Sequence, residues 1–357
     1  MLDFVQLGLP MNMLLFAVAA VAVWLAGARL TGYADAISRI TGLGQAVIGI
    51  ILLAGVTSLP EIGVTATASI AGDAQLAVNN LFGSIALQVA LLAVVDLMIG
   101  REALTAVVPD PAVMLQGALN ILLLSVAAAA MVAGDVGVFG VGLWAWACLF
   151  LYVAAVWSLA AVRRGKRPWL AARNGGIDER LISSSERHRH TDDVQSASLR
   201  PLLIKTGATA AVILAAGFVL ARSGDAIAQV SGLGQSFVGF VLVALATSLP
   251  ELSTALTAAR RGLYTMAISD ILGTNLINVA LLFVVDLLDT NEEVILNRMD
   301  DFAVFGALLA IALTAIFLAG LSARRDRSFL RMGYDSIAVM LTYAVGVAIL
   351  YTLRPDQ

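Results

Sequence analysis

Two stretches of 57 residues decide the fold of this 357-residue chain. The first, residues 42–98, reads GLGQAVIGIILLAGVTSLPEIGVTATASIAGDAQLAVNNLFGSIALQVALLAVVDLM. The second, residues 232–288, reads GLGQSFVGFVLVALATSLPELSTALTAARRGLYTMAISDILGTNLINVALLFVVDLL. They align without a gap at a displacement of 190 positions, and 25 of the 57 pairs are identical. The alignment indicates that one structural unit occurs twice in the chain.

The composition around these stretches is that of a membrane protein. Hydrophobic residues make up 60% of the chain, charged residues 13%, and the mean hydropathy is +0.90. A soluble domain carries about 25% charged residues, so a soluble enzyme is excluded. The net charge of −3 gives no indication of nucleic-acid binding. The single cysteine, Cys148, excludes an internal disulfide framework and a cysteine metal cluster.

Apolar runs predict the membrane helices. A helix that spans the bilayer needs about 20 apolar residues, so ten spans fit a chain of this length. The expected fold class is therefore an all-α polytopic membrane protein with ten transmembrane helices. We place them at residues 9–28, 43–70, 75–99, 110–133, 137–161, 201–221, 233–259, 263–288, 302–321 and 334–353.

The basic residues predict the orientation of these spans. With the N-terminus outside, the inner loops and inner helix ends hold 19 of the 22 Lys and Arg residues. Only Arg222, Arg298 and Arg354 fall on the outer side. Because basic residues accumulate on the cytoplasmic side, this asymmetry predicts that both termini are periplasmic or extracellular.

The number of helices in each half predicts the relation between the halves. Residues 1–161 form a first five-helix half with its repeat at 42–98, and residues 201–357 form a second with its repeat at 232–288. Five is odd, so the second half enters the membrane from the opposite side and the repeats are inverted. Inverted repeats are typical of transporters, which alternate access to one site near the bilayer midplane, rather than of enzymes.

The long polar segment between the halves, residues 162–200, is expected to be a cytoplasmic loop. It begins with a basic run that includes Arg164, Lys166 and Arg167. Such a run could contact anionic lipid headgroups, although a solvated linker is the favoured interpretation.

Each repeat carries the pentapeptide TSLPE in the middle of a predicted span, at 57–61 and 247–251. Proline lacks an N–H, so it frees carbonyl groups of the preceding turn, which persist at membrane depth only where they face protein, water or an ion. We expect the carbonyls of Ala54 and Ala244 to be of this kind. Hydroxyl oxygens are supplied at the first two positions of each pentapeptide, by Thr57, Ser58, Thr247 and Ser248.

The carboxylates of Glu61 and Glu251 are the sharpest indication of function. A carboxylate at the bilayer centre costs several kcal/mol unless it is paired, protonated or bound to a cation, and neither helix core contains Lys or Arg. Asn80 and Asp270 follow at equivalent positions on the next helices. Without thiolate or imidazole, this set predicts an all-oxygen site for a hard cation such as Ca²⁺ or Na⁺. Gly83 and Gly273, three residues further on, would allow close helix packing.

Other buried acids raise a rival interpretation. Asp96 and Asp286 match across the repeat near helix ends, where we favour a capping or gating role over ion binding. Together with Asp270 they could suggest an intramembrane aspartyl protease. No pair of GxGD-like and YD motifs occurs at membrane depth, and hydrolysis needs no inverted repeat, so a transporter is favoured.

The pentapeptides and the helices after them resemble the cation/calcium exchanger superfamily, most closely its prokaryotic sodium/calcium exchangers. That family pairs two inverted repeats that read roughly GTSLPE and then G[ND]xxGSNIxN. Here the segments are VTSLPE at 56–61 and ATSLPE at 246–251, followed by NLFGS at 80–84 and DILGTN at 270–275. The chain departs from the pattern at Val56 and Ala246, at Asn79 and Ser269, and across residues 84–88.

The resemblance implies a role for each matching position. Glu61 and Glu251 would bridge the ion sites, and Ser58 and Ser248 would complete flanking sodium sites. The other implied ligands are Thr57, Thr247, the carbonyls of Ala54 and Ala244, and, at the centre, Asn80 and Asp270. The implied protein is an inner-membrane antiporter that exchanges Ca²⁺ for Na⁺, both transported substrates, with no organic cofactor. A proton-coupled calcium/cation exchanger remains the alternative.

Overall fold

The computed structural model describes residues 4–99, 111–162, 199–231, 237–289, 291, 293–323, 328–329 and 332–353. In these residues the regular secondary structure is helical apart from two hairpins of two-residue strands. Within the described residues, seven helices are long and apolar enough to cross a membrane. The count becomes eight if the bent pair Gln45–Thr57 and Leu59–Ile70 forms one span. The loop expected at 162–200 lies outside the described residues, apart from its ends.

The first half contains two long helices, a broken helix and a hairpin between two further helices. Its elements are η1 (Val5–Leu7), α1 (Gly8–Thr41), α2 (Gln45–Ile48), η2 (Gly49–Leu53), α3 (Ala54–Thr57), α4 (Leu59–Ile70), α5 (Ala74–Ile99), α7 (Pro111–Ala133), β1 (Gly137–Val138), β2 (Val141–Gly142) and α8 (Leu143–Val162).

The second half follows the same order. Its elements are α10 (Leu199–Ser231), η3 (Val238–Val243), α12 (Ala244–Thr247), α13 (Leu249–Arg260), α14 (Tyr264–Leu288), η4 (Ile295–Arg298), α15 (Asp301–Ala323), β3 (Ser328–Phe329), β4 (Met332–Gly333) and α16 (Tyr334–Leu353). Three pairs of helices, α3 with α12, α4 with α13 and α7 with α15, coincide at the displacement of 190 at both ends. The hairpins, and α8 with α16, match at 191. The structural repeat therefore extends well beyond the 57 aligned residues.

The helix that carries each TSLPE pentapeptide is broken, where we expected one continuous span over 43–70 and over 233–259. A π-helical segment, η2 or η3, lies before each pentapeptide. The helix axis is then interrupted at Ser58 and Ser248, with a bend of 45° between the two parts in the first half. Pro60 and Pro250 are the second residues of the following helices, in the first turn, where a missing N–H costs no helical hydrogen bond. Proline therefore explains the position of the break.

Three other boundaries also differ from the prediction. The span expected at 137–161 begins only at Leu143, because residues 137–142 form the β1–β2 hairpin. Its turn contains Phe139 and Gly140, both with positive φ, which a helix does not accept. The first helix of each half, α1 and α10, continues at least ten residues past its predicted end, because the polar residues there do not break a helix.

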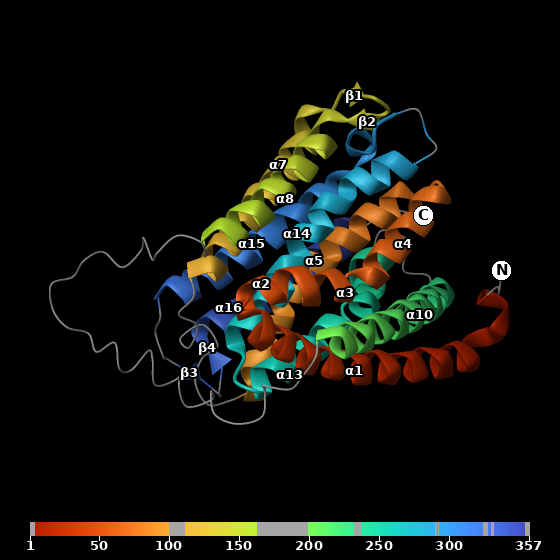
Figure 1. Cartoon of the computed structure of the whole chain (residues 1–357). Helices are drawn as coiled ribbons and strands as arrows, with labels where there is room; N and C mark the ends of the chain where they lie inside the picture. Colours follow the sequence, from red (N-terminus) through yellow and green to blue (C-terminus); the bar gives the residue numbers. More distant parts are fainter. Residues whose placement is uncertain are drawn as a thin grey trace, which may run out of the picture.

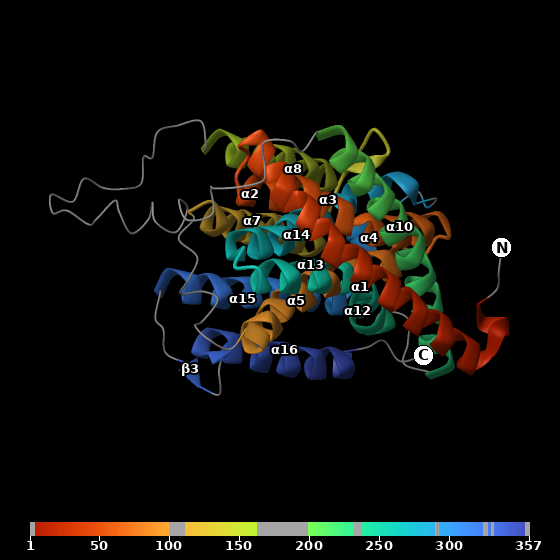
Figure 2. The ribbon, with the colours of Figure 1, turned by 60° about the horizontal axis from the view of Figure 1, so that its bottom comes forward.

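The two halves pack against each other in a reciprocal pattern. Helices α5 and α14 contact each other at the centre of the bundle, and α1 runs beside α10 along one side (Figures 1 and 2). Each of these helices also contacts the opposite half: α1 packs on α13 and α10 on α4, while α5 packs on η3 and α14 on η2. In the same way, α7 and α8 of the first half contact α14 of the second. Their equivalents, α15 and α16 of the second half, contact α5 of the first.

Glycines permit the closest of these contacts, as the sequence predicts. A Cβ on Gly83 of α5 would lie 2.6 Å from the Cα of Phe240 in η3. A Cβ on Gly273 of α14 would lie 2.9 Å from the Cα of Ile50 in η2. Because Ile50 and Phe240 are themselves equivalent positions, the two approaches are the same contact made twice. They bring α5 and α14 against the broken helices that hold the pentapeptides.

Candidate cation site

The predicted site residues lie where the broken helices meet α5 and α14. All ten of them are fully buried. Side-chain hydrogen bonds link Thr57 to Asp270 and, through Gln88, Glu61 to Ser248. The two repeats therefore contribute to one buried polar cluster.

Each pentapeptide threonine contacts the helix of the opposite half. Thr57 Oγ1 lies 3.4 Å from Thr274 Oγ1 on α14, and Thr247 Oγ1 lies 3.4 Å from Ser84 Oγ on α5. The same exchange is seen at the carboxylates, because Glu61 lies within electrostatic reach of Thr247, and Glu251 within electrostatic reach of Thr57, without a hydrogen bond of normal geometry. Each glutamate thus has a threonine of the other repeat beside it, which ties the two halves together at the site.

The glutamates carry unsatisfied acceptor capacity. Gln88 Nε2 donates to Glu61 Oε1 at 3.4 Å and to Ser248 Oγ at 3.3 Å. Glu61 Oε2 and both carboxylate oxygens of Glu251 have no hydrogen-bond partner among the described residues. Neither glutamate forms an ion pair with a described basic residue, since the described pairs are Arg39 with Asp35 and Arg298 with Asp289. Buried acceptors without partners are expensive, so this cluster favours a cation.

Asp270 joins the same cluster, whereas Asn80 does not join it through a hydrogen bond. Thr254 Oγ1 donates to Asp270 Oδ2, and Thr57 Oγ1 lies 3.5 Å from Oδ1. Asp270 also interacts electrostatically with Glu61 and Glu251. Asn80 is fully buried, and neither its amide oxygen nor its nitrogen has a partner in the described part of the chain.

The carbonyls of Ala54 and Ala244 are not freed by the prolines, so that part of the prediction is wrong. Ala54 O accepts the backbone N–H of Ser58 at 3.0 Å and its hydroxyl at 2.6 Å. Ala244 O accepts the N–H of Ser248 at 3.0 Å. A proline at position 60 or 250 removes the N–H that would reach four residues back, to Val56 or Ala246. A carbonyl oxygen has two lone pairs, and each of these carbonyls already accepts one backbone N–H and at least one hydroxyl, so an ion bound there would have to replace a hydroxyl donor.

Several polar residues of the cluster escaped the sequence prediction. Ser84 and Thr274, at equivalent positions, contact the pentapeptide threonines. Gln88 counts as a departure from the family motif, yet it bonds Glu61, and its equivalent, Asn278, is fully buried without an amide partner in the described chain. The sequence does carry a signal for these residues: polar side chains occur at equivalent positions of both repeats, on helices that are otherwise apolar. Thr254 has an apolar equivalent, Val64, and so gave no such signal.

The aspartates near the helix ends act as caps, as the sequence favours. Asp96 Oδ2 accepts from Gly333 N at 2.9 Å and from Ser336 Oγ at 2.7 Å. Asp286 accepts from Gly142 N at 2.5 Å and from Ile295 N at 2.8 Å. Both carboxylates hold a hairpin of the opposite half, and neither belongs to the cluster around the glutamates.

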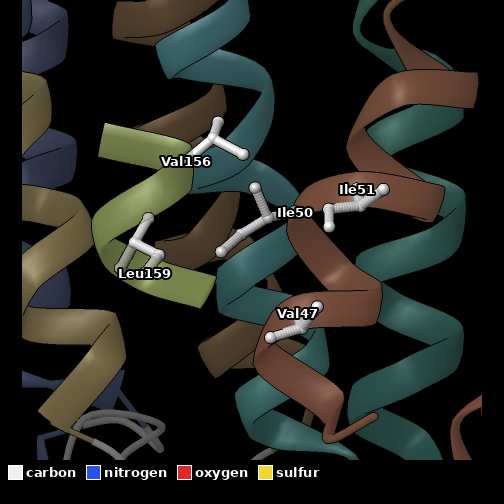
Figure 3. A pocket seen from close by; sticks show the side chains of 5 residues that line it. All are labelled: Val47, Ile50, Ile51, Val156 and Leu159. Carbon is white, nitrogen blue, oxygen red and sulfur yellow. The ribbon is translucent and has the colours of Figure 1, made fainter. Parts of the chain in front are cut away.

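Two further observations limit the kind of site. Among the described residues, no group of three or more His, Cys, Asp and Glu side chains is arranged to hold a metal ion. An ion in the cluster would therefore depend on hydroxyl, amide and carbonyl oxygens in addition to carboxylates. An apolar pocket between η2 and α8, lined by Val47, Ile50, Ile51, Val156 and Leu159 (Figure 3), offers no polar ligand.

Comparison with known families gives a match over most of the chain. The family model described as sodium/calcium exchanger protein matches residues 11–161 and 202–352. The inner membrane protein YrbG of Escherichia coli K12 is 26% identical over 329 residues, which cover 92% of this chain and 93% of that protein. The putative antiporter CaxA of Alkalimonas amylolytica is 26% identical over 72% of this chain and 74% of its own length.

Solved structures of the sodium-calcium exchanger NCX_Mj have a similar fold. A form soaked with 2.5 mM Na⁺ and 10 mM Sr²⁺ matches with a TM-score of 0.67 and 18% identity. A form soaked with 100 mM Na⁺ and 10 mM Sr²⁺ matches with a TM-score of 0.65 and 18% identity. In both cases the match covers 96% of this chain and 99% of the other. At this identity the likeness shows the fold, which confirms the helical architecture.

Proposed function

The chain belongs to the sodium/calcium exchanger protein family, and from that premise we propose that it exchanges Ca²⁺ for Na⁺ across the membrane. The observation that carries the proposal is the pair of fully buried glutamates. Glu61 and Glu251 come from equivalent positions of two repeats, and three of their four carboxylate oxygens lack a hydrogen-bond partner in the described chain. A cation at this position would supply the missing interactions.

We propose that the ion ligands are the residues expected from the sequence. These are Glu61, Glu251, Asp270, Asn80, Thr57, Thr247, Ser58, Ser248 and the carbonyls of Ala54 and Ala244. The hydroxyl contacts between the repeats support the threonines most directly, since each faces a glutamate of the other repeat. All of these ligands are oxygens or amides, which suit Ca²⁺ and Na⁺ rather than zinc or copper.

Exchange follows from the charge of the site. Either one divalent ion or several monovalent ions can neutralise the carboxylates, and an empty, charged site would be costly to move between the two faces of the membrane. Ten helices in two inverted halves, 1–161 and 201–357, would then provide the two access states. The reciprocal packing of the halves supports this arrangement, because exchanging equivalent contacts would interconvert states of similar energy. The inner membrane is the proposed location, as the name of the Escherichia coli relative suggests.

Uptake of ⁴⁵Ca²⁺ into vesicles that contain the purified protein tests the proposal. We expect an outward Na⁺ gradient to drive uptake, and Glu61→Gln or Glu251→Gln to abolish it. Glu293→Gln is the matched control, because Glu293 is exposed in a loop. Uptake that ignores the Na⁺ gradient but follows a pH gradient would replace this proposal with the proton-coupled alternative.

A further inference from the structure

The surroundings of Asp270 differ from those of its equivalent in the first repeat. Asp270 corresponds to Asn80, and Thr254 corresponds to Val64. The second repeat thus has an acid and a hydroxyl where the first has an amide and an aliphatic side chain. A similar difference separates α7 from α15, which coincide at the displacement of 190. Gln116 and Asn120 of α7 correspond to Gly306 and Ala310 of α15.

Thr254 holds one oxygen of the Asp270 carboxylate. Its hydroxyl contacts Asp270 Oδ2 and also lies 3.1 Å from Pro250 O and 3.0 Å from Glu251 O. A hydroxyl has one hydrogen, and an ionised carboxylate only accepts, so Thr254 must donate to Asp270. A hydrogen bond to a charged acceptor is stronger than one to a helix carbonyl. Oδ1 is left on the side of Thr57, a residue of the candidate cation site.

The two amides of α7 hold the backbone turn that carries Asp270. Gln116 Nε2 donates to Ser269 Oγ at 3.3 Å, and Asn120 Nδ2 donates to Leu272 O at 2.9 Å. Both amides are fully buried. Their targets flank Asp270 on either side along α14, so α7 fixes the turn while α13 fixes the carboxylate. At the place of Gln116, α15 has Gly306, which packs against the ring of Phe240.

We infer that Thr254 is a positioning residue that fixes the Asp270 carboxylate beside the cation site, with Gln116 and Asn120 as the support of its helix turn. The inference rests on the proposed function and adds a specificity determinant to it. A third negative charge at a fixed distance attracts a divalent ion twice as strongly as a monovalent one. Thr254 should therefore matter more for Ca²⁺ than for Na⁺.

The test compares Thr254→Val, which installs the side chain of the first repeat, with Thr254→Ser, which keeps the hydroxyl. In vesicles, we expect Thr254→Val to raise the half-saturating Ca²⁺ concentration about tenfold. We expect the half-saturating Na⁺ concentration to change less than about threefold, and Thr254→Ser to stay within about twofold of the unmodified protein for both ions. Thr314→Val is the matched control, since Thr314 is fully buried on α15 and its hydroxyl bonds Ala310 O of its own helix.

Asp270→Asn distinguishes positioning from a general structural effect. If Thr254 acts through the carboxylate, Thr254→Val should add less than about a twofold change in a protein that already carries Asp270→Asn. Asn120→Ala provides a second variant in case Thr254→Val does not fold. It should raise the half-saturating Ca²⁺ concentration about threefold in the unmodified background and leave it unchanged beside Asp270→Asn.

Three results would overturn the inference while the proposed function stands: an unchanged Ca²⁺ dependence in Thr254→Val, an equal loss for both ions, or an undiminished effect beside Asp270→Asn. If Thr254→Val does not fold, an Asn120→Ala variant that keeps its effect beside Asp270→Asn would overturn it as well. Failure of the proposed function looks different, because the unmodified protein itself would then show no Ca²⁺ uptake driven by Na⁺.

Discussion

The two repeats have the same backbone and the same glutamates but different polar support. Helices α3 and α4 of the first repeat coincide with α12 and α13 of the second at a displacement of 190. Each repeat places one glutamate in the cluster, beside a threonine of the other. Only the second repeat adds Asp270 with a hydroxyl donor, whereas the first has Gln88, which bonds Glu61. Shared residues thus define a cluster common to both halves, and unshared residues make it asymmetric.

The largest effect is expected where the repeats are identical. Glu61→Gln and Glu251→Gln should each lower Na⁺-driven Ca²⁺ uptake at least about a hundredfold, because each removes one of the charges that a buried cation requires. Rates of ⁴⁵Ca²⁺ uptake at matched protein density measure the loss. The comparison predicts losses of similar size, and a variant that keeps full uptake would break the equivalence of the two glutamates.

A second effect concerns the two close approaches of α5 and α14. Gly83→Ala would push a methyl group against three backbone atoms of Phe240, whereas Gly273→Ala would meet one backbone atom, the Cα of Ile50, and the Ala54 side chain. Overpacking of this kind costs about 1–3 kcal/mol, and backbone atoms yield less than side chains. We expect Gly83→Ala to lower the thermal midpoint in detergent more than Gly273→Ala does. The control Gly207→Ala has open space around it inside helix α10 and should keep or raise the midpoint, because alanine favours a helix more than glycine does.

The threonines that cross between the halves should give a smaller, paired effect. Thr57→Val and Thr247→Val each remove a hydroxyl that faces the opposite repeat, at Thr274 and Ser84 respectively. Loss of one hydrogen bond near a charge predicts about a tenfold rise in the half-saturating Ca²⁺ concentration. Because Thr57 also contacts Asp270, we expect Thr57→Val to bind Ca²⁺ more weakly than Thr247→Val does. Equal effects in the two variants would indicate that Asp270 does not contribute at Thr57.

The smallest effect on ion binding should come from the caps at the ends of α5 and α14. Asp96→Asn and Asp286→Asn each weaken the hold on a hairpin of the opposite half, with an expected cost of about 1–3 kcal/mol in stability. Thermal unfolding in detergent measures this cost. Ion affinity should not change, because neither carboxylate belongs to the cluster. A variant with a normal midpoint but altered Ca²⁺ affinity would instead favour the gating role.

Much of the fold could be predicted because its signals are local. Apolar runs mark the long helices, and the repeat marks the pairs of equivalent elements. The break at Ser58 follows from the proline two residues later, although we did not predict it. The β1–β2 hairpin was missed because Val136, Val138 and Phe139 look as apolar as a helix. Only the glycines and the positive φ at Phe139 separate the two possibilities.

The candidate site was predicted in its charged members and missed in part of its polar ones. Glu61 and Glu251 stand out in any sequence window, since a charge at membrane depth needs a reason. Gln88 and Thr254 do not, because an amide or a hydroxyl in a helix is usually satisfied by its own backbone. Their partners lie elsewhere: Ser248, the partner of Gln88, is 160 residues away in the sequence, and Asp270, the partner of Thr254, lies on the next helix.

By itself, the sequence determined that this is a membrane protein built from a repeat, and it predicted two glutamates at membrane depth as ligands of a cation. Those conclusions depend on hydropathy, spacing and charge, which are properties of the chain before it folds. Only the tertiary structure decided which side chains meet: the threonine of each repeat beside the glutamate of the other, and Thr254 on Asp270. The physical reason is that these contacts cross between helices, and their distances are set by the close packing at Gly83 and Gly273.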